Sequence, residues 1–278
     1  MSDEVDYIKT KLSETGFPLE ILIHSKLQSK LGYVIHQDYY FDYEGNKTRS
    51  VDLVADLDSK PLNWHYTDPI NFFMDSTLVL ECKKSSKHWV FFPIKDTFKL
   101  RNGQMCSLLQ RKDGFSLISE VDILSRGHQN KHPDGVASAY KVIDENKNYP
   151  NEIYEAIMQL TKYIQYNKKI ILDNKMNKIK PFIYKIYFWL PIIVFDGKIW
   201  IASMINGKIN EVVEVNHVIL SYESKSITTN RNDSFIIDVI KPDYLDDLID
   251  SLKQDVKEID ILLEKDKTRI IRDYNLSQ

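Results

Sequence analysis

Segments with helical hydrophobic periodicity alternate with β-type segments along this chain, and that order restricts the folds it can adopt. Residues 17–32 carry apolar side chains at helical spacing, which predicts an amphipathic helix. Two runs rich in β-formers, at about 33–43 and 49–57, flank residues 44–47, whose sequence EGNK is typical of a hairpin turn. A third β-type run ends near Lys83. The first part of the chain therefore predicts one helix followed by three strands.

A second helix and further strands follow. Residues 149–170 again have helical spacing, with Asn151 as a plausible N-cap. Residues 182–207 are almost continuously apolar and are interrupted at Asp196-Gly197, which indicates a buried strand and a hairpin. Residues 241–274 predict a long amphipathic helix.

This order of elements predicts an α/β (α+β) protein in which helices flank one central mixed β-sheet. A chain of 278 residues is long enough to bury a sizeable core. We expect a main domain over residues 1–205, with insertions at about 58–76 and 93–136, where turn-forming residues interrupt the pattern. A C-terminal extension over residues 206–278 would end in the amphipathic helix.

The last predicted helix has a continuous apolar stripe that must be buried. Such a stripe can pack on the protein's own sheet, or it can pair with a second copy of the chain, so a homodimer stays open. The stripe consists of Leu245, Leu248, Ile249, Leu252, Val256, Ile259, Leu262 and Leu263.

Composition limits the partners and the compartment. The formal net charge of -3 argues against a generally basic surface, so a nucleic-acid partner would have to be met by a local patch. Two cysteines, Cys82 and Cys106, are too few for a disulfide framework. The N-terminus does not have the pattern of a secretory signal, and no run of 18 apolar residues occurs. We therefore expect a cytoplasmic protein that does not span a membrane.

Charged residues inside two apolar strands indicate where the chemistry lies. Asp52 stands in an apolar strand, where a buried carboxylate without a partner costs roughly several kcal/mol. Glu81 and Lys83 share one face of their strand, because side chains alternate. If the two strands are neighbours, Asp52 and Glu81 can converge on a hard cation such as Mg²⁺. The alternative is an exposed Glu81–Lys83 ion pair on a strand that leaves the core.

Asp52 followed by Glu81-Cys82-Lys83 resembles the motif of the PD-(D/E)XK, or restriction-endonuclease-like, nucleases. The resemblance covers roughly residues 17–203, and Val51 stands where that family often has proline. It implies a mixed sheet with helices on both sides. It also implies that Asp52 and Glu81 bind Mg²⁺, for which Mn²⁺ can substitute, while Lys83 contacts the attacking water or the scissile phosphate.

Further residues take roles from the same resemblance. The residue between the Glu and the Lys often supplies its main-chain carbonyl to the metal, which implies Cys82 as a ligand through its backbone. A glutamate on the preceding helix often joins the site, which implies Glu20. Gln159 and Tyr163 are one helical turn apart and resemble the Gln-x-x-x-Tyr of RecB-type members, where the glutamine lies near the metal.

Glu20, Gln159 and Tyr163 each have a simpler interpretation. Glu20 can be a first-turn glutamate favoured by the helix dipole. Gln159 and Tyr163 can be surface or packing residues, because a pattern with two fixed positions is common by accident.

The function that the resemblance implies is metal-dependent hydrolysis of phosphodiester bonds, with DNA as the expected nucleic acid. The alternative is a nucleic-acid-binding or partner-binding module that retains the fold and lacks the chemistry.

Overall fold

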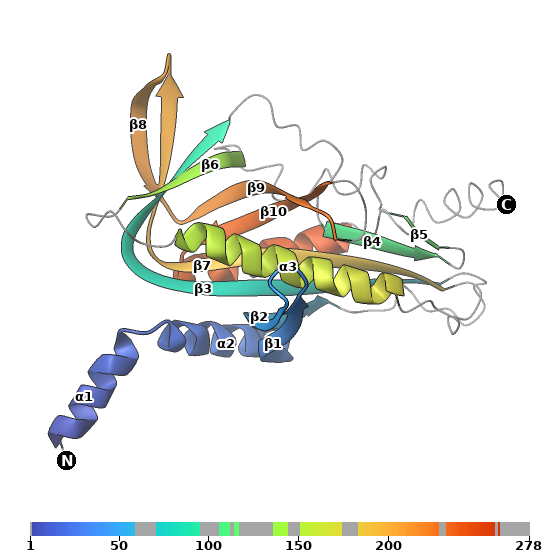
Figure 1. Ribbon diagram of the computed structural model, residues 1–278, viewed down its shortest axis with the longest axis horizontal. Helices are drawn as coiled ribbons and strands as arrows, with labels where there is room; N and C mark the ends of the chain where they lie inside the picture. The colour runs from blue at the N-terminus through green and yellow to red at the C-terminus, as the bar shows by residue number, and fades with distance from the viewer. Residues whose placement is uncertain are drawn as a thin grey trace.

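The computed structural model (Figure 1) describes residues 2–58, 71–94, 106–111, 114–116, 136–143, 151–173, 183–227, 232–258 and 261. Its helices are α1 (Ser2–Ser13), α2 (Phe17–Leu31), α3 (Glu152–Asp173), the 3₁₀ turn η3 (Pro242–Tyr244) and a C-terminal helix over 245–258. The strands are β1 (Val34–Asp42), β2 (Lys47–Asp58), β3 (Asn71–Ile94), β4 (Cys106–Arg111), β5 (Gly114–Ser116), β6 (Val136–Ile143), β7 (Ile183–Ile205), β8 (Lys208–Val215), β9 (His217–Lys225) and β10 (Asn232–Ile240).

The described strands form one ten-stranded mixed sheet in the order β1-β2-β3-β6-β9-β10-β7-β4-β5, with β8 beside β7. The long strands β3 and β7 pair in parallel from Asn71 and Ile183 to Phe91 and Ile201. β6, β9 and β10 connect the outer edges of β3 and β7, so that five strands pair in a ring. The predicted mixed α/β class is confirmed, whereas the order of elements did not indicate the ring.

Helices cover both faces of the sheet, as predicted. α2 and the C-terminal helix pack on one face, where the α2-side core forms. α3 covers the opposite face along β3 and β7 (Figure 1). The α2-side core includes Leu19, Ile23, Leu27, Leu53, Leu80, Ile192 and Leu252, and the α3-side core includes Val51, Val79, Ile153, Ile157, Leu160, Ile164 and Ile193.

Local sequence signals fix the ends of the helices. Asn151 Oδ1 accepts a hydrogen bond from the main-chain N–H of Tyr154 at 3.2 Å, so the predicted N-cap of α3 is confirmed. Pro18 lies in the first turn of α2. Gly32 follows α2 with φ 87°, a left-handed conformation in which a Cβ would be strained.

The predicted hairpin at Asp196-Gly197 is wrong, because both residues lie inside β7. A Cβ on Gly197 would stand 2.7 Å from the main-chain oxygen of Ser85, so glycine is needed here for the close approach of β3. The hairpin occurs instead at Asn206-Gly207, whose φ angles of 50° and 75° are those of a tight turn between β7 and β8.

The predicted domain limits also differ from the structure. Asn71–Ser76 belong to β3, and β4 and β5 lie within 93–136, so these parts of the expected insertions are sheet. The remaining positions of both insertions, apart from strand ends, lie outside the described residues. The expected boundary at 205 falls in the β7–β8 hairpin, and β9 and β10 continue the same sheet. The described residues beyond 205 are therefore part of the main fold.

The C-terminal stripe packs on the protein's own sheet. Leu245, Leu248, Ile249, Leu252 and Val256 are at most 1% exposed and belong to the α2-side core. The other predicted members, Ile259, Leu262 and Leu263, lie outside the described residues. No described helix is long and apolar enough to cross a membrane.

We predict that deleting residues 242–278 prevents cooperative folding. Five buried side chains worth roughly 1.5–3 kcal/mol each would be lost, which is comparable to the total stability of a domain. Circular dichroism melting of the truncated chain measures this, and Leu252→Ala, expected to cost about 2–5 kcal/mol, gives a graded version. Lys257→Ala, on the exposed side of the helix, is the control. A truncated chain with an unchanged melting transition would contradict the prediction.

Candidate active site

The candidate site forms where the pairing of β2 with β3 stops. The antiparallel register of the two strands ends at Leu53 and Leu80. Just beyond it, the main-chain N–H of Cys82 donates to Asp52 Oδ2 at 2.7 Å. The Asp52 side chain thus replaces a main-chain acceptor, and this bond holds its carboxylate beside Glu81.

A local irregularity in β1 and β2 turns the Asp52 side chain towards the main chain of β3 at Cys82. The β1–β2 register omits Gln37, which has a left-handed φ of 56°. Val51 and Leu53 pack in the two opposite cores, although strict alternation would place them on one face. Asp52 lies between them and is only partly buried, so strand parity alone does not determine where its carboxylate points.

Glu81 is fully buried, and one of its oxygens is paired. Lys83 Nζ donates to Glu81 Oε2 at 2.8 Å, so the two side chains share a face as predicted. Glu81 Oε1 is buried and has no hydrogen-bond partner among the described residues. The interpretation of Glu81 and Lys83 as an exposed ion pair is therefore wrong. A buried, unpaired carboxylate oxygen is unfavourable unless a proton or a cation binds it.

Gln159 of α3 completes the surroundings of Lys83. Its Oε1 accepts a hydrogen bond from Lys83 Nζ at 3.2 Å, and its Nε2 donates to the main-chain oxygen of Ser50 at 3.5 Å. The amide therefore connects α3 to β2 and β3. The structure thus brings Gln159 to the ammonium group of Lys83.

The pKa values of all three charged groups at the site, Asp52, Glu81 and Lys83, are raised. Burial raises the pKa of Glu81 to about 8, against the opposing attraction of Lys83, and the Asp52 carboxylate raises it further. Burial also raises the pKa of Asp52. Burial alone would lower the pKa of Lys83, but the carboxylates of Glu81 and Asp52 outweigh it and the pKa is raised. Without a cation, the site therefore favours a proton on Glu81 near neutral pH.

Glu20 lies beside this centre and does not join the Glu81–Lys83 pair. Its Oε2 is 3.1 Å from Nε2 of His36 in β1. The Glu20 carboxylate also contributes to raising the pKa of Asp52, after burial, which places the two carboxylates within electrostatic range. Glu20 therefore adds negative charge on the α2 side of Asp52.

Tyr163 makes no described contact with the site carboxylates of Asp52 and Glu81. Its hydroxyl donates to Asp38 Oδ2 at 2.6 Å, and its ring packs edge-on against Tyr40. Among its described contacts none reaches Asp52, Glu81 or Lys83, so Tyr163 fastens α3 to β1 and acts on the site only through that attachment.

The Cys82 side chain faces away from the site, as expected from alternation. It is 5% exposed and packs in the α2-side core, where burial raises the pKa of its thiol. A thiol kept neutral in an apolar core is a poor metal ligand. Any contribution of Cys82 to a metal site would come from its main chain.

Two residues near the site were missed by the sequence reasoning. His36 bonds Glu20, and Tyr40 is 1% exposed with a hydroxyl that has no hydrogen-bond partner among the described residues. Burial raises the pKa of Tyr40, and the nearby charge of Glu81 adds to this shift. Alternation along β1 would place both residues on one face, but His36 reaches Glu20 on α2 whereas Tyr40 packs in the α3-side core, so no local pattern indicated them.

The donor atoms fit a hard cation. In the described ranges, no three His, Cys, Asp or Glu side chains form a preassembled metal-binding group. Asp52 and Glu81 nevertheless supply adjacent carboxylates, one with the unpaired oxygen Oε1, and Mg²⁺ often uses only one or two carboxylates together with water. A bound cation would take the place of the proton on Glu81.

Comparison of the chain with models of known protein families, with curated protein sequences and with solved structures finds no significant match.

We predict that Glu81→Gln stabilises the metal-free protein at pH 8 but not at pH 4.5. The folded-state pKa of about 8 exceeds the ordinary value of 4.5, so between these values the folded protein binds more protons than the unfolded one. The stabilisation that Glu81 gives at low pH is lost as the pH rises towards 8. The variant removes this loss, which is about 4 kcal/mol between pH 4.5 and pH 8.

Urea unfolding of both proteins in EDTA from pH 4.5 to pH 8 measures the difference. Parallel stability curves for the wild type and the variant would show that Glu81 does not titrate in this way.

Proposed function

We propose that the protein is a metal-dependent nuclease of the PD-(D/E)XK type that hydrolyses phosphodiester bonds in DNA. The observation that carries the proposal is the fully buried Glu81, which has one oxygen on Lys83 and the other unpaired, next to Asp52. A structural ion pair would need neither the unpaired oxygen nor a second carboxylate. A site that receives a cation needs both.

Asp52, Glu81 and the main-chain carbonyl of Cys82 would hold Mg²⁺. When bound there, the ion supplies positive charge to the phosphoryl oxygen and lowers the pKa of a coordinated water. The N–H of Cys82 orients the Asp52 carboxylate through its 2.7 Å hydrogen bond. Glu20 adds negative charge near Asp52, which favours cation binding.

Lys83 has the role of stabilising charge on the reacting phosphate. Its raised pKa keeps the ammonium protonated at neutral pH, as that role requires. Glu81 Oε2 and Gln159 Oε1 both accept hydrogen bonds from Nζ and restrict its position. Gln159 is therefore a positioning residue, and Tyr163 supports it by fastening the same helix to β1.

We predict that Asp52→Asn and Lys83→Ala each lower Mg²⁺-dependent cleavage about 10²–10³-fold, as expected when a group that stabilises developing charge is removed. Plasmid, linear duplex, single-stranded DNA and RNA are incubated with Mg²⁺, with Mn²⁺ and with EDTA. Lys84→Ala is the matched control, because Lys84 is exposed and donates instead to the main-chain oxygen of Ser13. Absence of cleavage of all four substrates, with nucleic-acid binding retained, would favour the inactive binding module.

The pH dependence of cleavage should reflect competition between a proton and the metal for Glu81. Because the pKa of Glu81 is raised to about 8 without metal, activity should rise between pH 6 and pH 8. Higher Mg²⁺ should shift this rise to lower pH. Initial rates measured across this range at two Mg²⁺ concentrations provide the test, and a midpoint independent of Mg²⁺ would contradict the assignment.

A further inference from the structure

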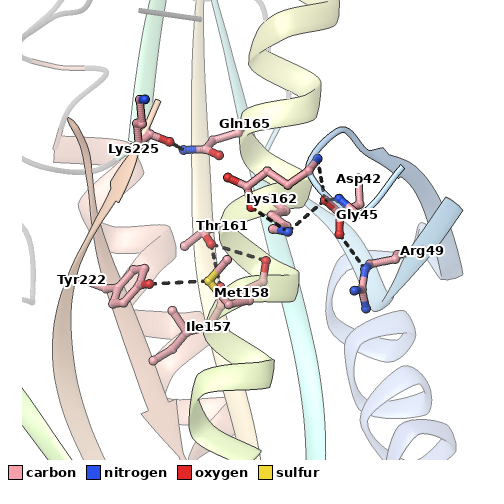
Figure 2. Close-up of polar contacts among 11 residues, drawn as sticks. Asp42, Gly45, Arg49, Ile157, Met158, Thr161, Lys162, Gln165, Tyr222 and Lys225 are labelled. Atoms are coloured by element: carbon pink, nitrogen blue, oxygen red, sulfur yellow. Dashed lines mark hydrogen bonds and ion pairs between the residues drawn. The ribbon is translucent and has the colours of Figure 1, made fainter. Parts of the chain in front are cut away.

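A groove between the β1–β2 hairpin and α3 opens beside the candidate site. Its volume is about 460 Å³, within the range of small-ligand pockets. Figure 2 shows the hairpin residues Asp42, Gly45 and Arg49 facing Lys162 on α3. The lining includes Tyr40, Arg49, Tyr154, Glu155, Met158 and Gln159.

Two lining residues connect this groove to the reacting centre. Gln159 accepts a hydrogen bond from Lys83 Nζ, and Tyr40 lies close enough to Glu81 for the carboxylate to affect its pKa. Only the Gln159 side chain would therefore separate the groove from the scissile phosphate of a strand bound beside Lys83.

The charges of the groove do not suit a run of phosphates. Asp42 is 2% exposed and binds both Arg49 Nε at 2.8 Å and Lys162 Nζ at 2.9 Å. Burial alone would raise the pKa of Asp42, but hydrogen bonds from Lys162, the Gly45 N–H and Arg49 lower it to about 2. The Asp42 carboxylate thus offsets part of the positive charge of Arg49 and Lys162.

Two carboxylates, those of Glu44 and Glu155, line the groove itself. Lys162 Nζ also lies 3.0 Å from Glu44, and Glu155 is exposed on α3. The lining therefore carries the carboxylates Glu44 and Glu155 against the cations Arg49 and Lys162, and the buried Asp42 behind it binds both cations. The lining therefore has no net positive charge to hold several phosphates, whereas its carboxylates can accept hydrogen bonds from N–H donors.

The remaining lining groups suit a flat, uncharged ring. Tyr154 is 46% exposed at the groove, and Met158 lies one turn further along α3. Arg49 bonds Asp42 through Nε, which leaves its terminal N–H groups without a partner among the described residues. A tyrosine face supports base stacking, a carboxylate accepts from an exocyclic amino group, and a guanidinium reaches one phosphate.

We propose that this groove binds one unpaired nucleobase of the substrate strand, with the ring against Tyr154 and an exocyclic amino group directed to Glu155. Arg49 meets the phosphate of the same nucleotide. This inference rests on the proposed nuclease function and makes it more specific. The substrate is a single strand, or a strand opened beside the cleavage point, because a paired base cannot enter the groove.

Binding is tested with the Glu81→Gln variant, so that cleavage does not interfere. Fluorescence anisotropy with Mg²⁺ compares ten-nucleotide oligomers of dA, dC and dT with a ten-base-pair duplex. We expect each single strand to bind more tightly than the duplex. We also expect dA and dC to bind more tightly than dT, because thymine has no exocyclic amino group.

Variants made in the same background separate the groups. Tyr154→Ala should weaken binding of single strands about tenfold or more, whereas Tyr154→Phe keeps the ring and should bind normally. Glu155→Ala should remove the preference of dA and dC over dT. Tyr39→Ala is the matched control, because Tyr39 is 63% exposed and does not line the groove.

The inference is overturned if Tyr154→Ala binds like its parent, if Tyr39→Ala loses as much affinity, or if the duplex binds as tightly as the single strands. Absence of binding to all four probes also overturns it. The two proposals fail separately. Expected binding without cleavage by the wild type retains the groove and rejects the nuclease, whereas cleavage with normal binding by Tyr154→Ala retains the nuclease and rejects the groove.

Discussion

The hydrogen bond between Lys83 and the fully buried Glu81 is the interaction on which the candidate site depends. A carboxylate buried within a sheet is strongly unfavourable as an ion, and Lys83 compensates only one of its oxygens. The negative charge on the other oxygen and on the adjacent Asp52 is not compensated, so a proton or a cation is favoured there. The pKa of Glu81 is raised to about 8 for this reason, so without a cation Glu81 retains a proton near neutral pH.

The pairing of β3 with its neighbours fixes the position of the buried Glu81. β3 is held on both sides, by β7 along its length and by β2 up to Leu80, so the side chains of Glu81 and Lys83 have little freedom. β2 leaves the pairing at Leu53, and the freed N–H of Cys82 is satisfied by Asp52. The break in pairing therefore supplies both the position of Asp52 and its hydrogen bond.

Part of this arrangement follows from sequence, because it depends on local periodicity. Alternation in one strand is enough to place Glu81 and Lys83 together, and Asn151 before an amphipathic segment is enough to locate the start of α3. The position of Gly197 inside a strand depends on the main chain of β3, which is distant in sequence. The bond from Tyr163 to Asp38 and the groove at Arg49 likewise depend on how α3 lies over the β1–β2 hairpin, which no local pattern specifies.

The central claim is that Asp52 and Glu81 form a cation site in which metal displaces a proton. Calorimetric titration of Mn²⁺ at pH 7.5, in two buffers of different ionisation enthalpy, measures both metal binding and proton release directly. We expect about one proton to be released for each ion bound to the wild type, and neither signal from Glu81→Gln. Binding of Mn²⁺ to Glu81→Gln with wild-type affinity and proton release, or no binding to the wild type, would contradict the account.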